Sequence, residues 1–122
     1  MSVVGIGIDL VAVDRLALLM ARHGDRFLAR CFRCWSPGGE HDDLSDLAGR
    51  WAAKEAFLKA LASNVKVIPY RDIEIGRNAA GAPVITTHGR ASLALAATGA
   101  RNVHLSIAPG ADFTVATVIL EK

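Results

Sequence analysis

The sequence predicts a single α+β domain in which a largely antiparallel sheet packs against a long central helix. Three observations lead to this fold class. The 122 residues suit one compact domain spanning 1–122. Hydrophobic residues make up 52% of the chain, which is enough to form a core and excludes a disordered chain. The hydrophobic period also changes along the chain from that of a strand to that of a helix and back, without a repeat or a linker.

The first strand is expected over residues 3–11, where side chains alternate between two faces. One face is apolar and carries Val4, Ile6, Ile8 and Leu10. We therefore expect the strand to be buried. The other face carries Gly5, Gly7 and Asp9. Two glycines on one face of a strand usually mean that another part of the molecule approaches the backbone closely. They do not form a dinucleotide-binding fingerprint, because the third glycine is absent.

Helical spacing follows in two stretches. Apolar residues over 14–30 predict two short helices, because the pattern is interrupted at His23-Gly24. The breaker over 36–39 separates this stretch from the best helix of the chain. That central helix is expected over 44–62, after polar residues that can cap it.

The second half of the chain returns to strand patterns around one short helix. We expect two strands joined by a turn, at 72–75 and 83–87, and then a short helix at 91–97 that Gly99 ends. Two more strands are expected at 103–108 and 113–120. Pro109-Gly110 predicts a hairpin between the last two strands. In the first strand of this hairpin, His104 and Ser106 share one face and the apolar residues take the other.

Charge and hydropathy together exclude several classes of partner. The net charge of +2 is too small for a protein that coats nucleic acid. No apolar run approaches the roughly 20 residues that a membrane span requires. No basic segment followed by an apolar core opens the chain either, so we expect a cytoplasmic protein without a membrane or nucleic-acid partner.

The cations are unevenly distributed, however. One stretch with a single acid, Asp25, contains Arg15, Arg22, Arg26, Arg30 and Arg33. Such a basic strip favours one acidic partner or one phosphate-rich ligand, although an ordinary solvated helix face gives the same pattern.

Two cysteines, Cys31 and Cys34, lie within this stretch. Without a second pair they do not make a zinc site, and we expect reduced thiols with packing roles.

Charged residues within apolar elements are the candidates for chemistry. Glu55 and Lys59 share one face of the central helix, where they could form an exposed ion pair. That helix is largely apolar, however, and charges on a buried helix need partners or a function. Two carboxylates with open positions, Asp9 and Glu55, suit Mg²⁺ completed by substrate phosphates. Lys59 and His104 can hold such phosphates, so the set indicates phosphoryl chemistry.

Two motifs resemble those of the holo-acyl-carrier-protein synthases, the small bacterial 4′-phosphopantetheinyl transferases. The first is Gly-Ile-Gly-Ile-Asp-Leu over 5–10, followed by Arg15. The second, over 47–61, is Leu-Ala-Gly-Arg-Trp-Ala-Ala-Lys-Glu-Ala-Phe-Leu-Lys-Ala-Leu. Further matches at 72–75, 81–83 and 104–107 extend the resemblance nearly from end to end. The resemblance implies a 4′-phosphopantetheinyl transferase-like fold over residues 1–122.

The resemblance also implies an activity. Such an enzyme transfers the 4′-phosphopantetheine arm of coenzyme A to a serine of apo-acyl carrier protein and releases 3′,5′-ADP, with Mg²⁺. The chain departs from the family at 62–64, where glycines are usual, and at Ala108-Pro109, where a second histidine is usual. These departures keep an alternative open, a catalytically weakened paralogue that binds the carrier protein.

The matched motifs imply site residues as well. Asp9 and Glu55 would bind Mg²⁺, and Glu55 would accept the serine proton, either directly or through a metal-bound water. Lys59 would contact the pyrophosphate. Three further residues would contact coenzyme A phosphates: His104, Arg50 and Lys54. The acidic carrier protein would face Arg15, Arg22 and Arg26. Family members are typically homotrimers with the coenzyme A site between subunits, and we expect the same here.

Overall fold

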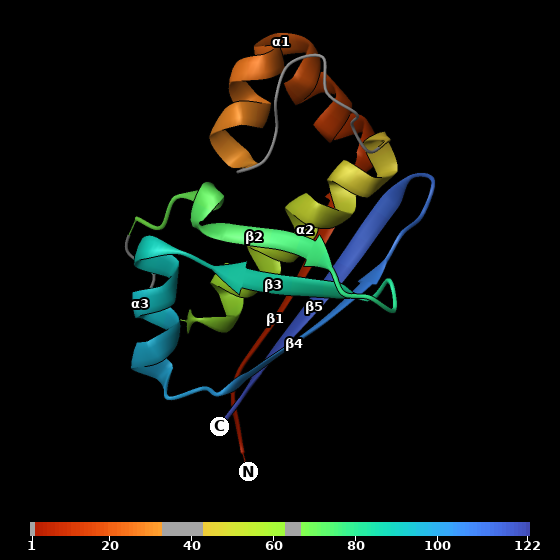
Figure 1. Ribbon diagram of the computed structural model, residues 1–122. Coiled ribbons are helices and arrows are strands. Elements are labelled where there is room, and N and C mark those ends of the chain that lie inside the picture. The colour runs from red at the N-terminus through yellow and green to blue at the C-terminus, as the bar shows by residue number, and fades with distance from the viewer. Residues whose placement is uncertain (1, 33–42, 63–66) are drawn as a thin grey trace.

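The structure, a computed structural model, describes residues 2–32, 43–62 and 67–122 (Figure 1). Its elements are β1 (Val3–Ala12), α1 (Val13–Cys31), α2 (Leu44–Ala60), the 3₁₀ turn η2 (Tyr70–Asp72), β2 (Ile73–Arg77), β3 (Pro83–Thr87), α3 (Gly89–Thr98), β4 (Asn102–Ala108) and β5 (Phe113–Glu121). The predicted α+β class is confirmed. Each predicted strand and helix that lies in the described residues is present, with bounds shifted by a few residues.

The strands form two antiparallel sheets rather than the one sheet that was expected. The larger has the order β1-β5-β4, and the smaller pairs β2 with β3. α2 packs against β1 and β5 of the larger sheet and against β2 of the smaller sheet. In Figure 1 the strands of the smaller sheet cross the direction of those of the larger sheet. The core lies along α2, where small side chains let the sheets come close: Ala48, Ala52, Ala53, Ala56 and Ala60 are all buried.

The glycines of β1 are explained by the position of α2. A Cβ atom added at Gly7 would overlap the carbonyl oxygen of Ala56, and one added at Gly5 would overlap that of Ala60. The helix backbone therefore lies directly against the strand, as two glycines on one face predict. This close approach places the residue that follows on the same face, Asp9, beside α2.

The prediction that β1 is a buried strand was wrong for its apolar face. The side chains of Val4, Ile6, Ile8 and Leu10 are between 38% and 65% exposed. Register explains this outcome: Ile6 and Ile8 lie opposite Ile119 and Thr117 of β5, on the face that points away from α2. Within one chain α2 covers only the glycine face of β1, so an apolar outer sheet face remains exposed.

Local signals account for the helix ends. Gly24 has non-helical angles (φ 51°, ψ −134°) that kink α1, which confirms the break expected at His23-Gly24. The side chain of Asp43 accepts a hydrogen bond from the amide of Asp46 (2.9 Å) and caps α2. Gly99 ends α3 in the left-handed conformation (φ 78°). The breaker at 36–39 lies outside the described residues.

Cys31 is a buried free thiol, as the packing role predicts, and burial raises its pKa so that it stays neutral. Cys34 lies outside the described residues. None of the described helices combines the length and the apolar character that a membrane span requires.

Candidate functional site

A pocket of about 370 Å³ brings together three of the predicted site residues. Asp9 reaches it from β1, Arg15 from α1 and Glu55 from α2. The remaining walls are largely apolar and come from the same elements and from the start of β5: Leu10, Val11, Ala12, Leu16, Leu19, Trp51 and Phe113. We call this the carboxylate pocket. It places two carboxylates and one guanidinium at the junction of β1, α1 and α2.

Lys59 pairs with Asp9 instead of with its helical neighbour Glu55. Its ammonium lies 2.9 Å from Asp9 Oδ1 and also donates to the carbonyl oxygen of Ile8 (3.0 Å). The Lys59 side chain is 56% exposed, so this ion pair is open to solvent and of modest strength. An incoming phosphate can therefore compete for the same ammonium. The alternative of a Glu55–Lys59 surface ion pair is not what the described structure contains.

Glu55 has a partner that the sequence did not reveal. The hydroxyl of Tyr70 in η2 donates a hydrogen bond of 2.6 Å to Glu55 Oε1. Burial and this contact with the Glu55 carboxylate raise the pKa of Tyr70, so its hydroxyl stays a donor at neutral pH. The ring lies against Trp51, with centroids 4.7 Å apart. No local pattern separates this tyrosine from an ordinary core aromatic, which is why sequence reasoning missed it.

Lys54 is the clearest departure from the expected site. Its side chain is 1% exposed, and its ammonium donates to the backbone carbonyl oxygens of Tyr70 (2.9 Å) and Ile73. It also lies 5.2 Å from the ring centroid of Phe32. A buried ammonium bound in this way ties α2 to η2 and β2. Its role is structural, and we correct the expectation that it contacts coenzyme A.

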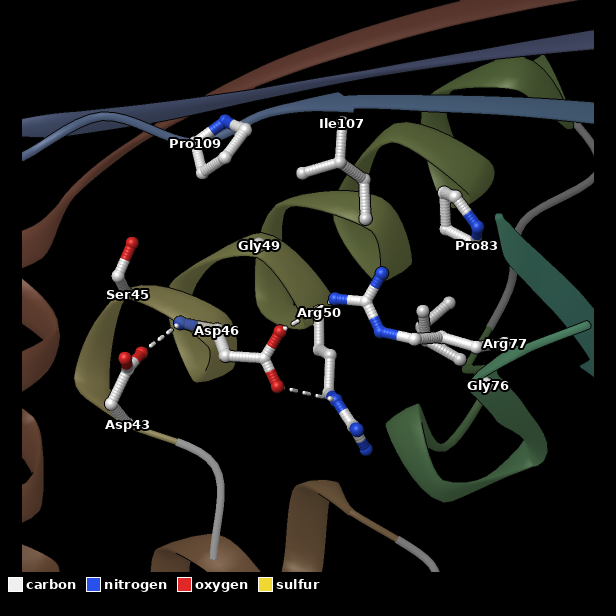
Figure 2. A pocket seen from close by; sticks show the side chains of 11 residues that line it. Asp43, Ser45, Asp46, Gly49, Arg50, Gly76, Arg77, Pro83, Ile107 and Pro109 are labelled. Atoms are coloured by element: carbon white, nitrogen blue, oxygen red, sulfur yellow. Dashed lines mark hydrogen bonds and ion pairs between the residues drawn. The ribbon is translucent and has the colours of Figure 1, made fainter. Parts of the chain in front are cut away.

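Arg50 lines a second pocket, of about 520 Å³, between α2, the β2–β3 hairpin and the end of β4 (Figure 2). Figure 2 shows the carboxylate of Asp46 between two guanidinium groups. Arg77 donates to Asp46 Oδ1 at 3.0 Å, and Arg50 Nε lies 3.6 Å from Asp46 Oδ2. We call this the arginine pocket. Two arginines and two acids, Asp43 and Asp46, line it, and Arg77 was not predicted.

His104 lies apart from both pockets in the single chain. It pairs with Ile119 across the β4–β5 ladder, as Ile6 does across the β1–β5 ladder, which places it on the outer sheet face. Its side chain is 58% exposed, and Nε2 lies 3.2 Å from Glu121 Oε1. Asp9 points to the opposite face. One chain alone therefore does not bring His104 to the carboxylate pocket.

Four of the five arginines of the basic strip lie on α1, and the fifth, Arg33, lies outside the described residues. Arg15, Arg22 and Arg26 are all exposed, and Arg15 also lines the carboxylate pocket. The strip therefore starts at the pocket and leads away from it along the helix. This placement fits a partner that docks on α1 and reaches into the pocket.

The donors at the carboxylate pocket fit a magnesium ion. The described residues contain no group of three or more His, Cys, Asp or Glu side chains that could hold a metal by themselves. Mg²⁺ does not need such a group, since it commonly takes one or two carboxylates and completes its shell with waters and substrate phosphates. Asp9 and Glu55 supply the two carboxylates at one pocket.

Sequence comparisons identify relatives over nearly the whole chain. A family model described as the 4′-phosphopantetheinyl transferase superfamily matches residues 5–118. A holo-[acyl-carrier-protein] synthase of Nitratidesulfovibrio vulgaris (strain DP4) is 42% identical over 125 residues, covering 98% of this chain and 99% of that protein. Another, from Koribacter versatilis, is 36% identical and covers 98% of each chain.

Solved structures show the same fold. The holo-[acyl-carrier-protein] synthase of Neisseria meningitidis superposes with a TM-score of 0.84 at 32% identity, covering 99% of this chain and 100% of that chain. The Helicobacter pylori synthase, solved in complex with coenzyme A, has a TM-score of 0.78 at 30% identity, covering 95% of this chain and 99% of that one.

Proposed function

The chain belongs to the 4′-phosphopantetheinyl transferase superfamily, and from this premise we propose that it transfers the 4′-phosphopantetheine arm of coenzyme A to a serine of apo-acyl carrier protein. One observation carries the proposal: Asp9, Glu55 and Arg15 line a single pocket, with the Lys59 ammonium bound to Asp9. Carboxylates and cations around one cavity are the groups that transfer from a pyrophosphate requires.

The reaction exchanges one phosphorus–oxygen bond for another. The serine oxygen attacks the phosphorus that carries the pantetheine arm, and the bond from this phosphorus to the bridging oxygen breaks. 3′,5′-ADP leaves with the bonding electrons. The serine proton goes to the Glu55 carboxylate, which lies at the pocket wall. Lys59, whose side chain is more than half exposed, offsets the charge that develops on the departing pyrophosphate oxygen.

Asp9 and Glu55 are the residues that would hold Mg²⁺. The ion would neutralise pyrophosphate charge when bound. The two carboxylates share one pocket with Arg15, and Lys59 is bound to Asp9. Metal and coenzyme A should therefore bind with positive coupling, because each brings charge that the other compensates.

The arginine pocket supplies further cations for coenzyme A. Arg50 and Arg77 offer guanidinium groups at its wall, and we assign Arg50 to a phosphate of the cofactor. His104 has the same proposed role from the outer sheet face. Lys54 is left out because its ammonium is buried.

The outer sheet face supports assembly into a homotrimer. Val4, Ile6, Ile8 and Leu10 of β1 expose a continuous apolar surface, which soluble monomers rarely do. A trimer is a closed symmetry that covers such a face in every subunit. Because His104 lies on this same face, assembly would bring it to a subunit boundary, as the family's shared coenzyme A site requires.

The basic strip is the proposed docking surface for the acidic carrier protein. Arg15, at the pocket, would guide the serine toward Glu55, while Arg22 and Arg26 would hold the body of the carrier protein. The modified carrier protein would then serve fatty acid biosynthesis in the cytoplasm.

Mass spectrometry tests the whole proposal. Incubation with apo-acyl carrier protein, coenzyme A and Mg²⁺ should add one phosphopantetheine arm to the carrier protein. Omission of coenzyme A is the control. Carrier protein that binds without gaining mass would instead support the weakened paralogue.

A further inference from the structure

Tyr70 contacts the proposed catalytic carboxylate directly. Its hydroxyl donates a 2.6 Å hydrogen bond to Glu55 Oε1, a length typical of a strong bond to a charged acceptor. We propose that Tyr70 is a positioning residue, whose hydroxyl holds the Glu55 carboxylate in the orientation that binds Mg²⁺ and receives the serine proton. The inference rests on the role proposed above for Glu55.

Tyr70 is itself held in place from two sides. The buried ammonium of Lys54, the residue next to Glu55 on α2, donates to the Tyr70 carbonyl oxygen at 2.9 Å. On the other side the Tyr70 ring lies against Trp51, one turn before Glu55 on the same helix. The phenol therefore has a fixed position relative to α2, and a fixed donor can orient a flexible carboxylate.

Packing alone does not account for the hydroxyl. A phenylalanine would fill the same space against Trp51 and leave the Lys54 contact to the backbone unchanged. The hydroxyl adds one thing, a bond to an oxygen of the glutamate that lines the carboxylate pocket. Donors that orient metal-binding side chains act in this way, and their loss commonly costs about 10- to 100-fold in metal affinity or activity.

The Tyr70→Phe variant isolates this bond. We expect kcat and the affinity for Mg²⁺ alone, measured by calorimetry, each to fall about tenfold. At saturating Mg²⁺ the KM for coenzyme A should stay within about twofold, because the variant touches neither Lys59 nor the arginine pocket. Ser92→Ala is the matched control, since it removes another partly buried hydroxyl hydrogen bond, to Thr87, between two residues that line neither pocket. It should leave both quantities unchanged.

A spectroscopic measurement on the folded wild-type protein gives a second readout. Tyr70 is the single tyrosine of the chain, so labelling with [ζ-¹³C]tyrosine gives one resonance. We expect this resonance to move when Mg²⁺ alone is added and also in Glu55→Gln, because both change the charge on the acceptor. It should stay in place in Ser92→Ala.

The outcomes separate this inference from the proposed function. Full activity in Glu55→Gln overturns the role of Glu55 and the inference with it. An inactive Glu55→Gln beside a fully active Tyr70→Phe with normal Mg²⁺ affinity overturns the inference alone. A tyrosine resonance that moves in neither test also overturns it, even if Tyr70→Phe is slow.

Discussion

Replacing Gly7 with alanine tests whether the contact between β1 and α2 builds the site. The added Cβ would overlap the backbone carbonyl of Ala56, and the amide of Ala60 lies close to the same point. A backbone carbonyl cannot rotate away as a side chain can, so α2 must shift. Overpacking of a core typically costs about 1–3 kcal/mol in the free energy of unfolding, and we expect about 3 kcal/mol here.

That cost is large enough to measure by thermal melting. For a chain of this length, 1 kcal/mol corresponds to about 4 °C in Tm, so Gly7→Ala should lower Tm by about 12 °C. Turnover should fall as well, since the shift moves Glu55 away from Asp9. Gly76→Ala is the control for stability: a Cβ there meets no heavy atom within 4 Å, and the backbone is extended. It should leave Tm unchanged or raise it slightly.

The two variants should be melted at the same protein concentration, because assembly also contributes to stability. Equal melting temperatures for Gly7→Ala and the wild type would refute the argument that the glycine is required by the close approach of the helix. So would a Gly76→Ala variant that is as unstable as Gly7→Ala.

Three further predictions follow from the site and the surfaces. Glu55→Gln should lower turnover by orders of magnitude in the carrier-protein assay while melting as a folded protein, whereas Glu74→Gln, which weakens a partly exposed pair with His88, should change turnover little. Reversing three arginines of the basic strip (Arg15, Arg22 and Arg26) to Glu should raise the KM for carrier protein but not for coenzyme A. Carrier-protein binding by the wild type should also weaken with salt, and an unchanged KM in the variant would show that the strip is an ordinary solvated face. Ile8→Lys on the outer sheet face should reduce the mass measured by light scattering to that of a monomer, whereas Leu93→Lys, on the exposed side of α3, should not. A wild-type protein that is a monomer at micromolar concentration would count against the trimer.

Elements were predictable where a short stretch of chain carries the signal. The kink at Gly24, the cap at Asp43 and the end of α3 at Gly99 each depend on one residue and its immediate neighbours. The glycine face of β1 could be predicted as a close contact for the same reason, although its partner could not be named. The division into two sheets was missed, because strand pairing depends on residues far apart in the sequence.

Site residues were predictable by type but not by partner. Spacing on a helix makes Glu55 and Lys59 neighbours, yet Lys59 binds Asp9, which lies 50 residues away in the sequence. Likewise Lys54 and Tyr70 are 16 positions apart, and this separation hides the contact that gives Lys54 its structural role. Helical neighbours pair weakly, so a better-placed partner from another element displaces them.

The sequence by itself determined the α+β class, the main elements and the two motifs that contain Asp9 and Glu55. Those features depend on local periodicity and on residue types, which can be recognised without coordinates. Only the tertiary structure decided that Asp9, Arg15 and Glu55 share one pocket, that Tyr70 holds Glu55, and that β1 leaves its apolar face uncovered. The reason is physical: burial and side-chain pairing depend on which distant element packs on a given face, and an alternating apolar strand looks the same whether a helix or another subunit covers it.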